Sequence, residues 1–363
     1  MSDTTSAGMP IRTAFRRQAR ACKELGSPFT AKLLNLLADD LSEQTPVGKA
    51  VLDWPGDPSA DALALRLAGA LHALVLTGES AALTHVYPPT GKPSNDLLKQ
   101  AIEAALVDHE DTILRFIDSP PQTNEVARSA VLAAGFLTVA AQTSLPLAIL
   151  EIGSSAGLNL NWDSFSYNLG SLNFGQACGR PLLAPDWEGP QPPNAEVVVN
   201  ERAGCDRAPI DLGSEDEVLR LRAYIWPDQP HRMARLDQAL EVAGTKPISI
   251  ASADAADWIA SHLKTMRDGI ATILFHSIVW QYIPKDRQER LEDLIAHAGN
   301  KATSNAPFAW LRMEPETANA ASLRLTLWPH GQTRHLADVD YHGRWVRWHI
   351  EPRTLLRHEE SER

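Results

Sequence analysis

An acidic residue followed by a turn of small residues is the part of this chain with the clearest chemical potential. The apolar run 147–152 contains Glu151, and the turn 153–157 (GSSAG) follows it. An apolar strand, an acid and a glycine-containing turn form the place where an open α/β sheet makes room for a nucleotide-like ligand. The same letters fit G-x-S-x-G, in which Ser155 would be a nucleophile exposed on a sharp turn. The two interpretations predict different functions.

Other polar residues with chemical potential stand at the ends of later apolar runs. Asp206, Asp254, His276 and Glu314 each close or follow a run that is typical of a buried strand. A neutral imidazole at His276 can act as a general base, or it can be a hydrogen-bonded structural group. Glu314 either faces a ligand cleft or forms an ion pair with Arg312.

Two kinds of periodicity show which elements must position these residues. From Ile11 to about Thr143 apolar residues recur at helical spacing without a convincing strand, which predicts an all-α lobe. After Pro146 short apolar or β-branched runs alternate with helical stretches, which predicts βαβ units and a mainly parallel sheet. The last three runs, between residues 322 and 348, look like antiparallel strands that close one edge.

These patterns predict a helical N-terminal lobe over residues 1–144, an α/β domain over 145–352 and a polar C-terminal tail over 353–363. An insertion over 159–194 separates the first two predicted strands. Helices are predicted within the α/β domain at 215–224, 231–243, 255–264 and 285–298.

The segment 147–160 (LAILEIGSSAGLNL) resembles the first motif of class I S-adenosylmethionine-dependent methyltransferases. The resemblance implies a Rossmann-like sheet, mostly parallel with an antiparallel C-terminal edge, and S-adenosylmethionine as the cofactor. It also implies that Glu151 helps to hold the methionine amine. The residues implied to line the cofactor in this segment are Glu151, Gly153, Ser155, Gly157 and Asn159. Ser155 stands where the family's middle glycine is expected.

Later segments resemble further motifs of the same family, in the same order. Gly204-Cys205-Asp206 resembles the G-x-D that ends the second strand, where a carboxylate accepts hydrogen bonds from the ribose diol. The resemblance therefore implies that Asp206 holds the ribose and that Asp254 receives the adenine amino group. Residues 275–295 resemble the fourth-strand region, which leads over the substrate into a helix.

The implied reaction is methyl transfer to an unidentified small or medium-sized acceptor. We predict His276 and Tyr282 as catalytic groups, and Asn124, Trp280 and Glu314 as substrate-binding groups. Core packing is the alternative role for Trp280 and Tyr282. Asn124 is also predicted to cap a helix over residues 125–142.

Two other functions remain open. One is a non-catalytic ligand-binding protein on the same fold, because a fold does not fix a function. The other is a serine hydrolase in which Ser155 acts with a later acid and a later histidine. The helical lobe before the GSSAG turn and the absence of an evident role for Glu151 in a nucleophile elbow count against the hydrolase.

The whole chain also resembles a bacterial family of unknown function. The motifs that carry this resemblance are FRRQA (15–19), QTNEV (122–126), EIG-x-SAGLN (151–159), WPDQ (226–229), HS-x-x-WQY (276–282) and HGRW (342–345). They extend nearly from end to end, but they imply no reaction.

Composition limits the possible partners. The formal net charge of −11 argues against nucleic acid as the main partner. A basic helix from Arg12 to Lys23 is interpreted as a solvated face, with docking to an anion or a partner as the alternative. The absence of a signal pattern and of a membrane-length apolar run predicts a cytoplasmic protein without a membrane partner. A small-molecule substrate follows only from the implied methyl transfer. The three cysteines predict neither a disulfide framework nor a zinc site, and no metal site is predicted.

Overall fold

The computed structural model of the 363-residue chain describes residues 8–90, 93–317 and 320–350. The chain forms two compact units, of which unit 1 is Met1–Thr123 with Asp211–Ala234 and unit 2 is Asn124–Ile210 with Arg235–Arg363. The predicted polar tail over residues 353–363 lies outside the described residues. None of the described helices is long and apolar enough to cross a membrane.

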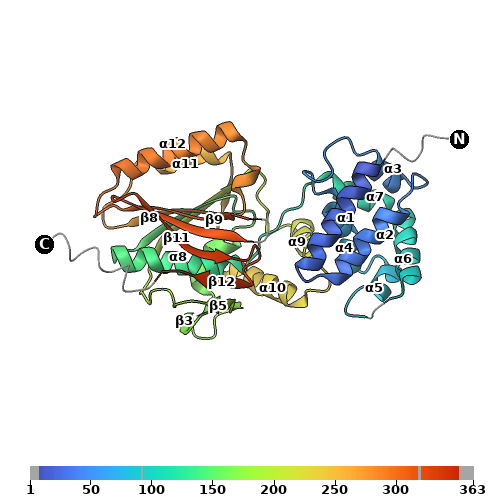
Figure 1. Cartoon of the computed structure of the whole chain (residues 1–363), viewed down its shortest axis with the longest axis horizontal. Helices are drawn as coiled ribbons and strands as arrows, with labels where there is room; N and C mark the ends of the chain where they lie inside the picture. Colours follow the sequence, from blue (N-terminus) through green and yellow to red (C-terminus); the bar gives the residue numbers. More distant parts are fainter. Residues whose placement is uncertain (1–7, 91–92, 318–319, 351–363) are drawn as a thin grey trace. The chain divides into compact units, whose positions relative to one another are not determined.

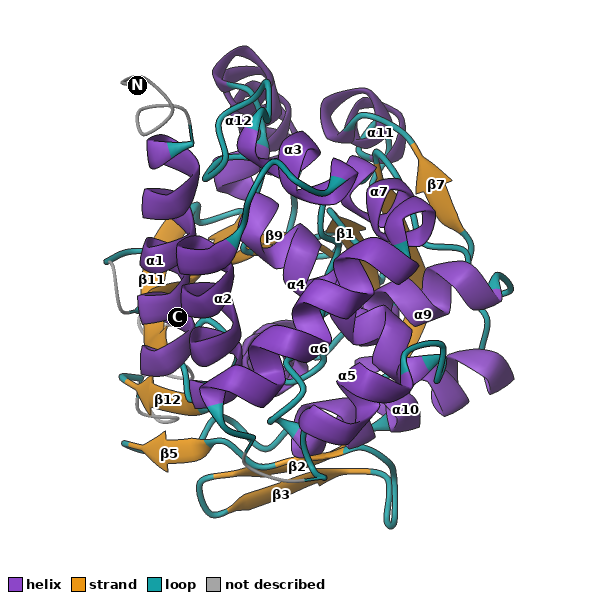
Figure 2. Cartoon of the chain, turned by 90° about the vertical axis from the view of Figure 1, so that its right-hand side faces the viewer, coloured by secondary structure: helices purple, strands orange, loops and turns teal. Residues whose placement is uncertain are grey.

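Unit 1 is built from helices, drawn in purple in Figure 2. They are α1 (Met9–Glu24), α2 (Pro28–Asp40), α3 (Pro46–Leu52), α4 (Leu63–Leu76), α5 (Ala81–Val86), α6 (Asn95–Asp108), α7 (Glu110–Asp118), α9 (Glu215–Ala223) and the beginning of α10 (Pro230–Thr245). Five of them begin after a side-chain hydroxyl that accepts a hydrogen bond from the backbone of the first turn, namely Ser27, Thr45, Ser80, Ser94 and Ser214. Their apolar faces share one core.

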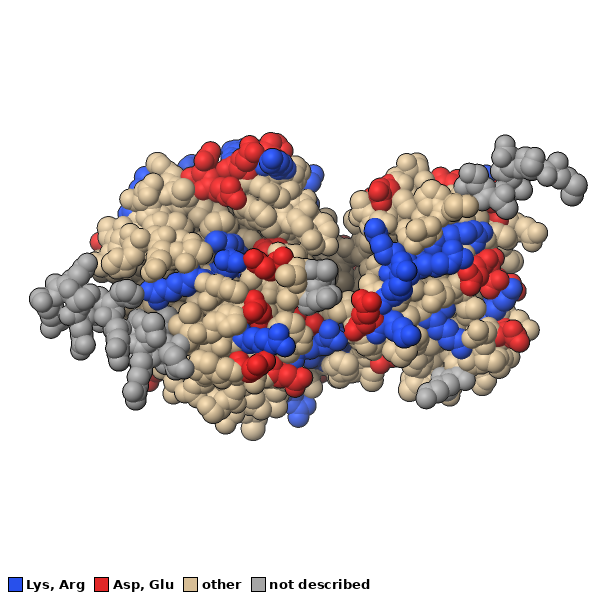
Figure 3. Space-filling model, viewed as in Figure 1, with Lys and Arg blue, Asp and Glu red and all other residues tan. Residues whose placement is uncertain are grey.

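The basic helix predicted between Arg12 and Lys23 is α1. Figure 3 shows Lys and Arg side chains gathered over this part of unit 1. Arg12 donates hydrogen bonds to the carbonyl oxygens of Ala38 and Leu41, at 2.5 and 2.6 Å, and so satisfies carbonyls at the end of α2. Arg16 forms an exposed ion pair with Asp39 at 2.6 Å. Part of the basic face thus connects α1 to α2.

The compact units differ from the predicted division at residue 144 in two respects. Residues 124–144 belong to unit 2, and residues 211–234 belong to unit 1. The second difference has a clear packing cause, because Tyr224 lies in the core of unit 1 and a Cβ added at Gly69 would meet its ring at 2.8 Å. His72 and Ala223 add a buried contact between Nδ1 and the carbonyl oxygen at 3.1 Å.

The centre of unit 2 is a sheet in which the described residues form nine strands. Across the sheet the order is β5 (Asp186–Glu188), β12 (Trp345–Trp348), β11 (Gln332–Val339), β10 (Ala321–Trp328), β9 (Phe308–Pro315), β8 (Ala271–Ser277), β1 (Leu147–Ile152), β6 (Val199–Asp206) and β7 (Ile250–Ser252). Strands β7, β6, β1, β8 and β9 are parallel, whereas β10, β11 and β12 pair antiparallel. The mostly parallel sheet with an antiparallel C-terminal edge is confirmed.

Helices cover both faces of this sheet (Figure 1). On one face lies α8 (Arg128–Thr143), where Phe136 contacts Phe275 edge-on with ring centroids 5.1 Å apart. On the other face, α11 (Ala255–His262) and α12 (Lys285–Lys301) share a core cluster with residues of β1 and β8. The β1 residues Leu147–Ile152 are all buried, as expected for a central parallel strand covered on both faces.

The predicted insertion over 159–194 contains structure that the sequence did not reveal. A 3₁₀ helix, η1 (Leu158–Ser164), follows the GSSAG turn. Strands β2 (Ser166–Leu169), β3 (Leu172–Gly175) and β4 (Leu182–Leu183) then form a small separate sheet. At the start of η1 the Leu158 amide donates a hydrogen bond to the side chain of Asn124, at 2.8 Å.

Candidate functional site

The topology of unit 2 has a switch point between β1 and β8. From β1 the chain continues to β6 and β7 on one side, then returns to β8 on the other side of β1. In open α/β sheets, ligands bind outside the carboxyl ends of the strands at such a point. The GSSAG turn and the segment after Ser277 lie at these carboxyl ends.

The GSSAG turn has three residues in left-handed backbone conformation. Gly153, Ser155 and Gly157 have φ of 70°, 52° and 71°. Both glycines are also needed for space, since an added Cβ would lie 2.4 Å from Val279 at Gly153 and 2.6 Å from Ile250 at Gly157. Ser155 has a conformation that favours glycine, which costs free energy for a residue with a Cβ. The turn therefore packs closely against residues that adjoin β8 and β7.

Asp206 connects this turn to the end of β6. Its Oδ2 accepts a hydrogen bond from the Ser155 amide at 2.9 Å, and its Oδ1 accepts one from the Ala208 amide at 3.0 Å. An ionised carboxylate has about four acceptor positions, so these two bonds leave capacity for a hydroxyl donor on each oxygen. The predicted ribose-binding residue is thus fixed in orientation by backbone amides.

Glu151 is buried near the carboxyl end of β1, and one of its carboxylate oxygens lacks a hydrogen bond in the described residues. Its side chain is buried, and its Oε2 has no hydrogen-bond partner in the described residues. Burial raises the pKa of Glu151 well above its ordinary value, and the nearby charge of Asp206 raises it further. Arg128 acts in the opposite direction but does not compensate. A cationic ligand group at this position would satisfy the carboxylate.

Ser155 is a poor nucleophile in this arrangement. Its hydroxyl is buried, and within the part of the chain that the structure describes it has no hydrogen-bond partner. A serine nucleophile needs a base within hydrogen-bond reach. The neighbouring thiol of Cys205 is also unsuited to nucleophilic attack, because burial raises its pKa to about 12.

His276 is completely buried, and both of its ring nitrogens are engaged. Nε2 lies 3.0 Å from the indole Nε1 of Trp310, and Nδ1 lies 2.6 Å from Glu314 Oε1. An indole N–H only donates, so Nε2 must accept and the proton of a neutral ring is on Nδ1. This geometry favours the structural role of His276, and its role as a general base stays a prediction.

Glu314 organises the segment that follows β8. Besides contacting His276, its Oε1 accepts hydrogen bonds from the amides of Val279 and Trp280, at 3.1 and 3.2 Å. Its Oε2 is buried without a hydrogen-bond partner in the described residues. Between these amides and β8, Ile278 has φ of 53°, an outlier for a β-branched residue. The alternative ion pair with Arg312 is not formed, because the Arg312 guanidinium lies over the Trp310 ring, 3.9 Å from its centroid.

The two aromatic residues predicted near the substrate differ in exposure. Trp280 stacks on His276 with ring centroids 5.1 Å apart and is half-buried. Tyr282 lies in the short helix η2 (Trp280–Tyr282) and is 71% exposed. Core packing is therefore wrong for Tyr282, whose side chain is open to solvent.

Asp254, at the carboxyl end of β7, is already used within the fold. It is the N-cap of α11 and accepts hydrogen bonds from the amides of Ala256 and Asp257. It also forms an ion pair with Arg287 at 2.9 Å, and these partners hold the pKa of Asp254 below its ordinary value despite partial desolvation. The predicted adenine amino group would therefore have to bind Asp254 in addition to the two amides and Arg287.

Two asparagines brace the segment after the turn. Asn159 is buried and accepts a hydrogen bond from the Ser129 hydroxyl at 2.7 Å. Asn124 accepts from the amide of Leu158, so its predicted role as a helix cap is wrong. The helix α8 begins at Arg128, three residues later than predicted, because the Asn124 side chain is directed at another segment.

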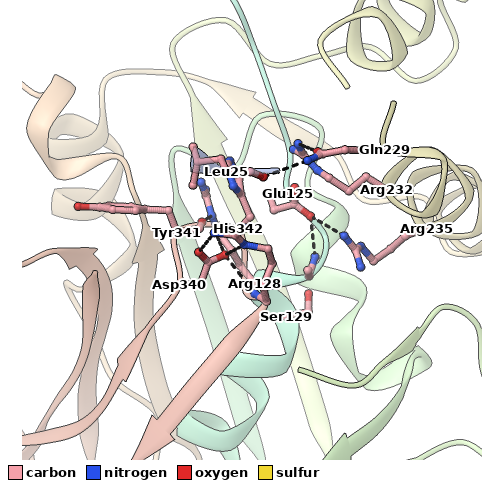
Figure 4. A network of polar contacts seen from close by, with 12 residues as sticks. Leu25, Glu125, Arg128, Ser129, Gln229, Arg232, Arg235, Asp340, Tyr341 and His342 are labelled. Carbon is pink, nitrogen blue, oxygen red and sulfur yellow. Dashed lines mark hydrogen bonds and ion pairs between the residues drawn. The ribbon is translucent and has the colours of Figure 1, made fainter. Parts of the chain in front are cut away.

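The sequence places Arg128 among polar groups at the front of a buried helix, predicted to cap the helix or bond between lobes first and to contribute to the pocket second. In the structure Arg128 connects several elements of unit 2 (Figure 4). Its guanidinium donates to the carbonyl oxygens of Tyr341 and Ser277, at 2.9 and 3.3 Å. It thereby fixes the end of β8. In the same view Glu125 pairs with Arg235 at 3.5 Å.

Comparison with known proteins identifies the family of the chain. Residues 12–348 match the family DUF2332, described as "uncharacterized protein conserved in bacteria", and the chain belongs to this family. Comparison with curated proteins and with solved structures gave no match. The site geometry therefore has to carry any functional conclusion.

Proposed function

We propose that this DUF2332 protein binds S-adenosylmethionine at the carboxyl ends of β1 and β6 and transfers the methyl group to a small or medium-sized acceptor. The observation that carries the proposal is the meeting of Glu151 and Asp206 at a left-handed turn beside the switch point. Glu151 is buried with no hydrogen-bond partner for its Oε2 in the described residues, and Asp206 is held by two backbone amides. This pair suits a ligand with a cationic end and a diol.

The charge distribution supports a cation beside Glu151. A buried carboxylate whose pKa is raised by desolvation gains most from a neighbouring positive charge. The methionine part of the cofactor carries an ammonium group, which would donate to Glu151 Oε2. Asp206 would accept from the ribose hydroxyls while it keeps the amides of Ser155 and Ala208.

The chemistry needs little from the protein beyond positioning. S-adenosylmethionine supplies a methyl group that is already activated on a sulfonium centre. The residues of this chain would hold the donor in line with the acceptor and exclude water. Because both nitrogens of His276 are engaged, an acceptor that needs deprotonation would rely on another group, and the exposed hydroxyl of Tyr282 stands at this strand end.

Thermal unfolding with and without ligand tests the proposal. S-adenosylmethionine and S-adenosylhomocysteine should both stabilise the protein, by about 2.7 kcal/mol at roughly 100 times the dissociation constant. ATP shares the adenosine part but lacks the methionine part, so it should have a much smaller effect. No shift with millimolar S-adenosylmethionine would contradict the proposal.

A matched pair of variants separates binding from folding. Asp206→Ala should abolish the ligand shift, whereas Asp257→Ala, on an exposed side chain of α11, should retain it. Incubation of the protein with radiolabelled cofactor and a metabolite pool then tests turnover. Binding without any transfer would favour the non-catalytic alternative, and covalent labelling of Ser155 by a fluorophosphonate would favour the hydrolase.

A further inference from the structure

Two histidines and one aspartate converge near the C-terminal edge of the unit 2 sheet. Asp338 Oδ1 lies 3.0 Å from His335 Nε2, and Asp338 Oδ2 lies 3.1 Å from His349 Nε2. One nitrogen or oxygen atom from each of the three side chains lies within 4.8 Å of the corresponding atoms of the other two. None of these residues belongs to the proposed cofactor site.

A bulge in β11 brings His335 and Asp338 to the same face. In a regular strand, residues three apart point to opposite faces of the sheet. The pairing of β11 with β10 shifts by one residue between Ala337 and His335, so that Leu336 is an extra residue. Leu336 and Ala337 are both completely buried, which leaves His335 and Asp338 on the other face. Bulges are frequent where a side chain has to be re-aimed.

The third residue comes from the end of the neighbouring strand β12. Asp338 pairs with Arg347 across the two strands, and His349 is two residues further along, on the same face. The amide of His349 donates to the carbonyl oxygen of Leu336 at 2.9 Å, which fixes this end of the chain beside the bulge. Arg347 forms an ion pair with Glu188, at 2.9 Å, so its charge has a partner away from Asp338.

The geometry points to a divalent transition-metal site formed by His335, Asp338 and His349, with Zn²⁺ as the best-suited ion. Imidazole nitrogen and carboxylate oxygen are Zn²⁺ ligands with bonds of about 2.0–2.2 Å. Two ligand atoms of a tetrahedral ion with such bonds are roughly 3.3 Å apart, close to the two observed contacts. Three protein ligands leave one position for water or another ligand.

The exposure of the cluster fits an ion that exchanges with solvent. The three side chains are 35%, 37% and 40% exposed, for His335, Asp338 and His349. An ion can therefore enter without a rearrangement of the core. An isolated surface ion pair needs only one histidine and one aspartate. Here Asp338 contacts two imidazoles, one with each carboxylate oxygen.

Binding of Zn²⁺ to the metal-free full chain tests this inference. Calorimetric titration after removal of metal with a chelator should show one high-affinity ion per chain. Asp338→Asn and His349→Ala should each weaken binding by about tenfold or more, because each removes or weakens a direct ligand. Replacement of Zn²⁺ by Co²⁺ should give the visible absorption of a tetrahedral cobalt site, and this absorption should be lost in both variants.

His330→Ala is the matched control, since His330 is exposed in the turn between β10 and β11 and is not part of the cluster. This variant should bind Zn²⁺ like the natural protein. Unchanged affinity in both Asp338→Asn and His349→Ala, with intact unfolding transitions, would overturn the inference. An equal loss in His330→Ala would also overturn it, because the binding would then be non-specific.

Discussion

The acids at neighbouring strand ends of unit 2 fall into two groups that differ in how far the fold already uses them. Glu151 in β1 and Asp206 in β6 make no ion pair among the described residues, and Glu151 Oε2 has no hydrogen-bond partner there. Asp254 and Glu314 instead cap a helix and a turn. The same residue type at the same sheet edge is therefore used by the fold in one place, and in the other it keeps acceptor capacity for the ligand that we propose.

The difference follows from the groups that surround each acid. Asp254 has Arg287 beside it, and Glu314 receives His276 and two amides on one oxygen. Buried polar groups with such partners stabilise the local fold, whereas a buried carboxylate without them destabilises it. Glu151 retains a destabilising feature that a cationic ligand would remove. Variants of the two groups should accordingly have opposite effects on stability.

Glu314→Ala should have the largest effect. It leaves the Nδ1–H of His276 and the amides of Val279 and Trp280 without their acceptor, which should lower the unfolding free energy by about 3–5 kcal/mol. Urea unfolding measures this value. Glu188→Ala removes an exposed acid and should cost less than about 1 kcal/mol. A similar small cost for both variants would contradict the structural role of Glu314.

Glu151→Gln should change how stability depends on pH. Because the pKa of Glu151 is raised in the folded protein, the folded chain keeps this proton at a pH where the unfolded chain has lost it. The contribution of Glu151 to stability therefore falls as the pH rises from about 5 towards the folded pKa, by about 1.4 kcal/mol per unit of the shift.

The Gln variant lacks this titration, so its unfolding free energy relative to the natural protein should increase as the pH rises from about 5 towards the folded pKa of Glu151. Parallel urea titrations at several pH values give the difference. A constant difference over this range would show that Glu151 does not carry a raised pKa. S-adenosylmethionine, if it binds as proposed, should stabilise the Gln variant less than the natural protein.

Ser155→Gly should stabilise the protein by about 1 kcal/mol. The change removes the Cβ from a residue with φ of 52° and also removes a buried hydroxyl without a partner. Ser154→Ala is the matched control, since its hydroxyl donates to the carbonyl oxygen of Glu151 at 3.0 Å and its loss should destabilise. Retained cofactor binding in Ser155→Gly would count against the hydrolase, and loss of stability would contradict the strain at this turn.

Asp254→Asn should have the smallest effect. Asparagine is as good an N-cap as aspartate, and only the partly exposed ion pair with Arg287 is lost. The unfolding free energy should fall by less than about 1 kcal/mol. Asp254→Ala, which also loses the cap, should cost about 1 kcal/mol more. A larger effect of either change on cofactor affinity than on stability would support the predicted contact with adenine.

Much of the chain after Pro146 could be predicted because its signals are local. The alternation of apolar runs with helical stretches gave the parallel strands, the antiparallel edge and the helices α9 to α12 close to their observed bounds. The elements that were missed lie between residues 158 and 188, where strands of two to four residues are too short to show a period. The return of residues 211–234 to unit 1 was also missed. The apolar pattern of a helix shows that one face is buried, but it does not indicate in which core.

The sequence by itself determined which residues stand at the carboxyl ends of the strands, since strand length and apolar period depend on neighbours along the chain. Only the tertiary structure decided what those residues are free to do. It engaged both nitrogens of His276, directed Asn124 to Leu158, and left Glu151 buried without compensation. It also brought His335 to the face of Asp338 through a bulge that no sequence period shows. Hydrogen bonding and burial arise between segments far apart in the chain, and they decide whether a polar group is used by the fold or remains for a ligand.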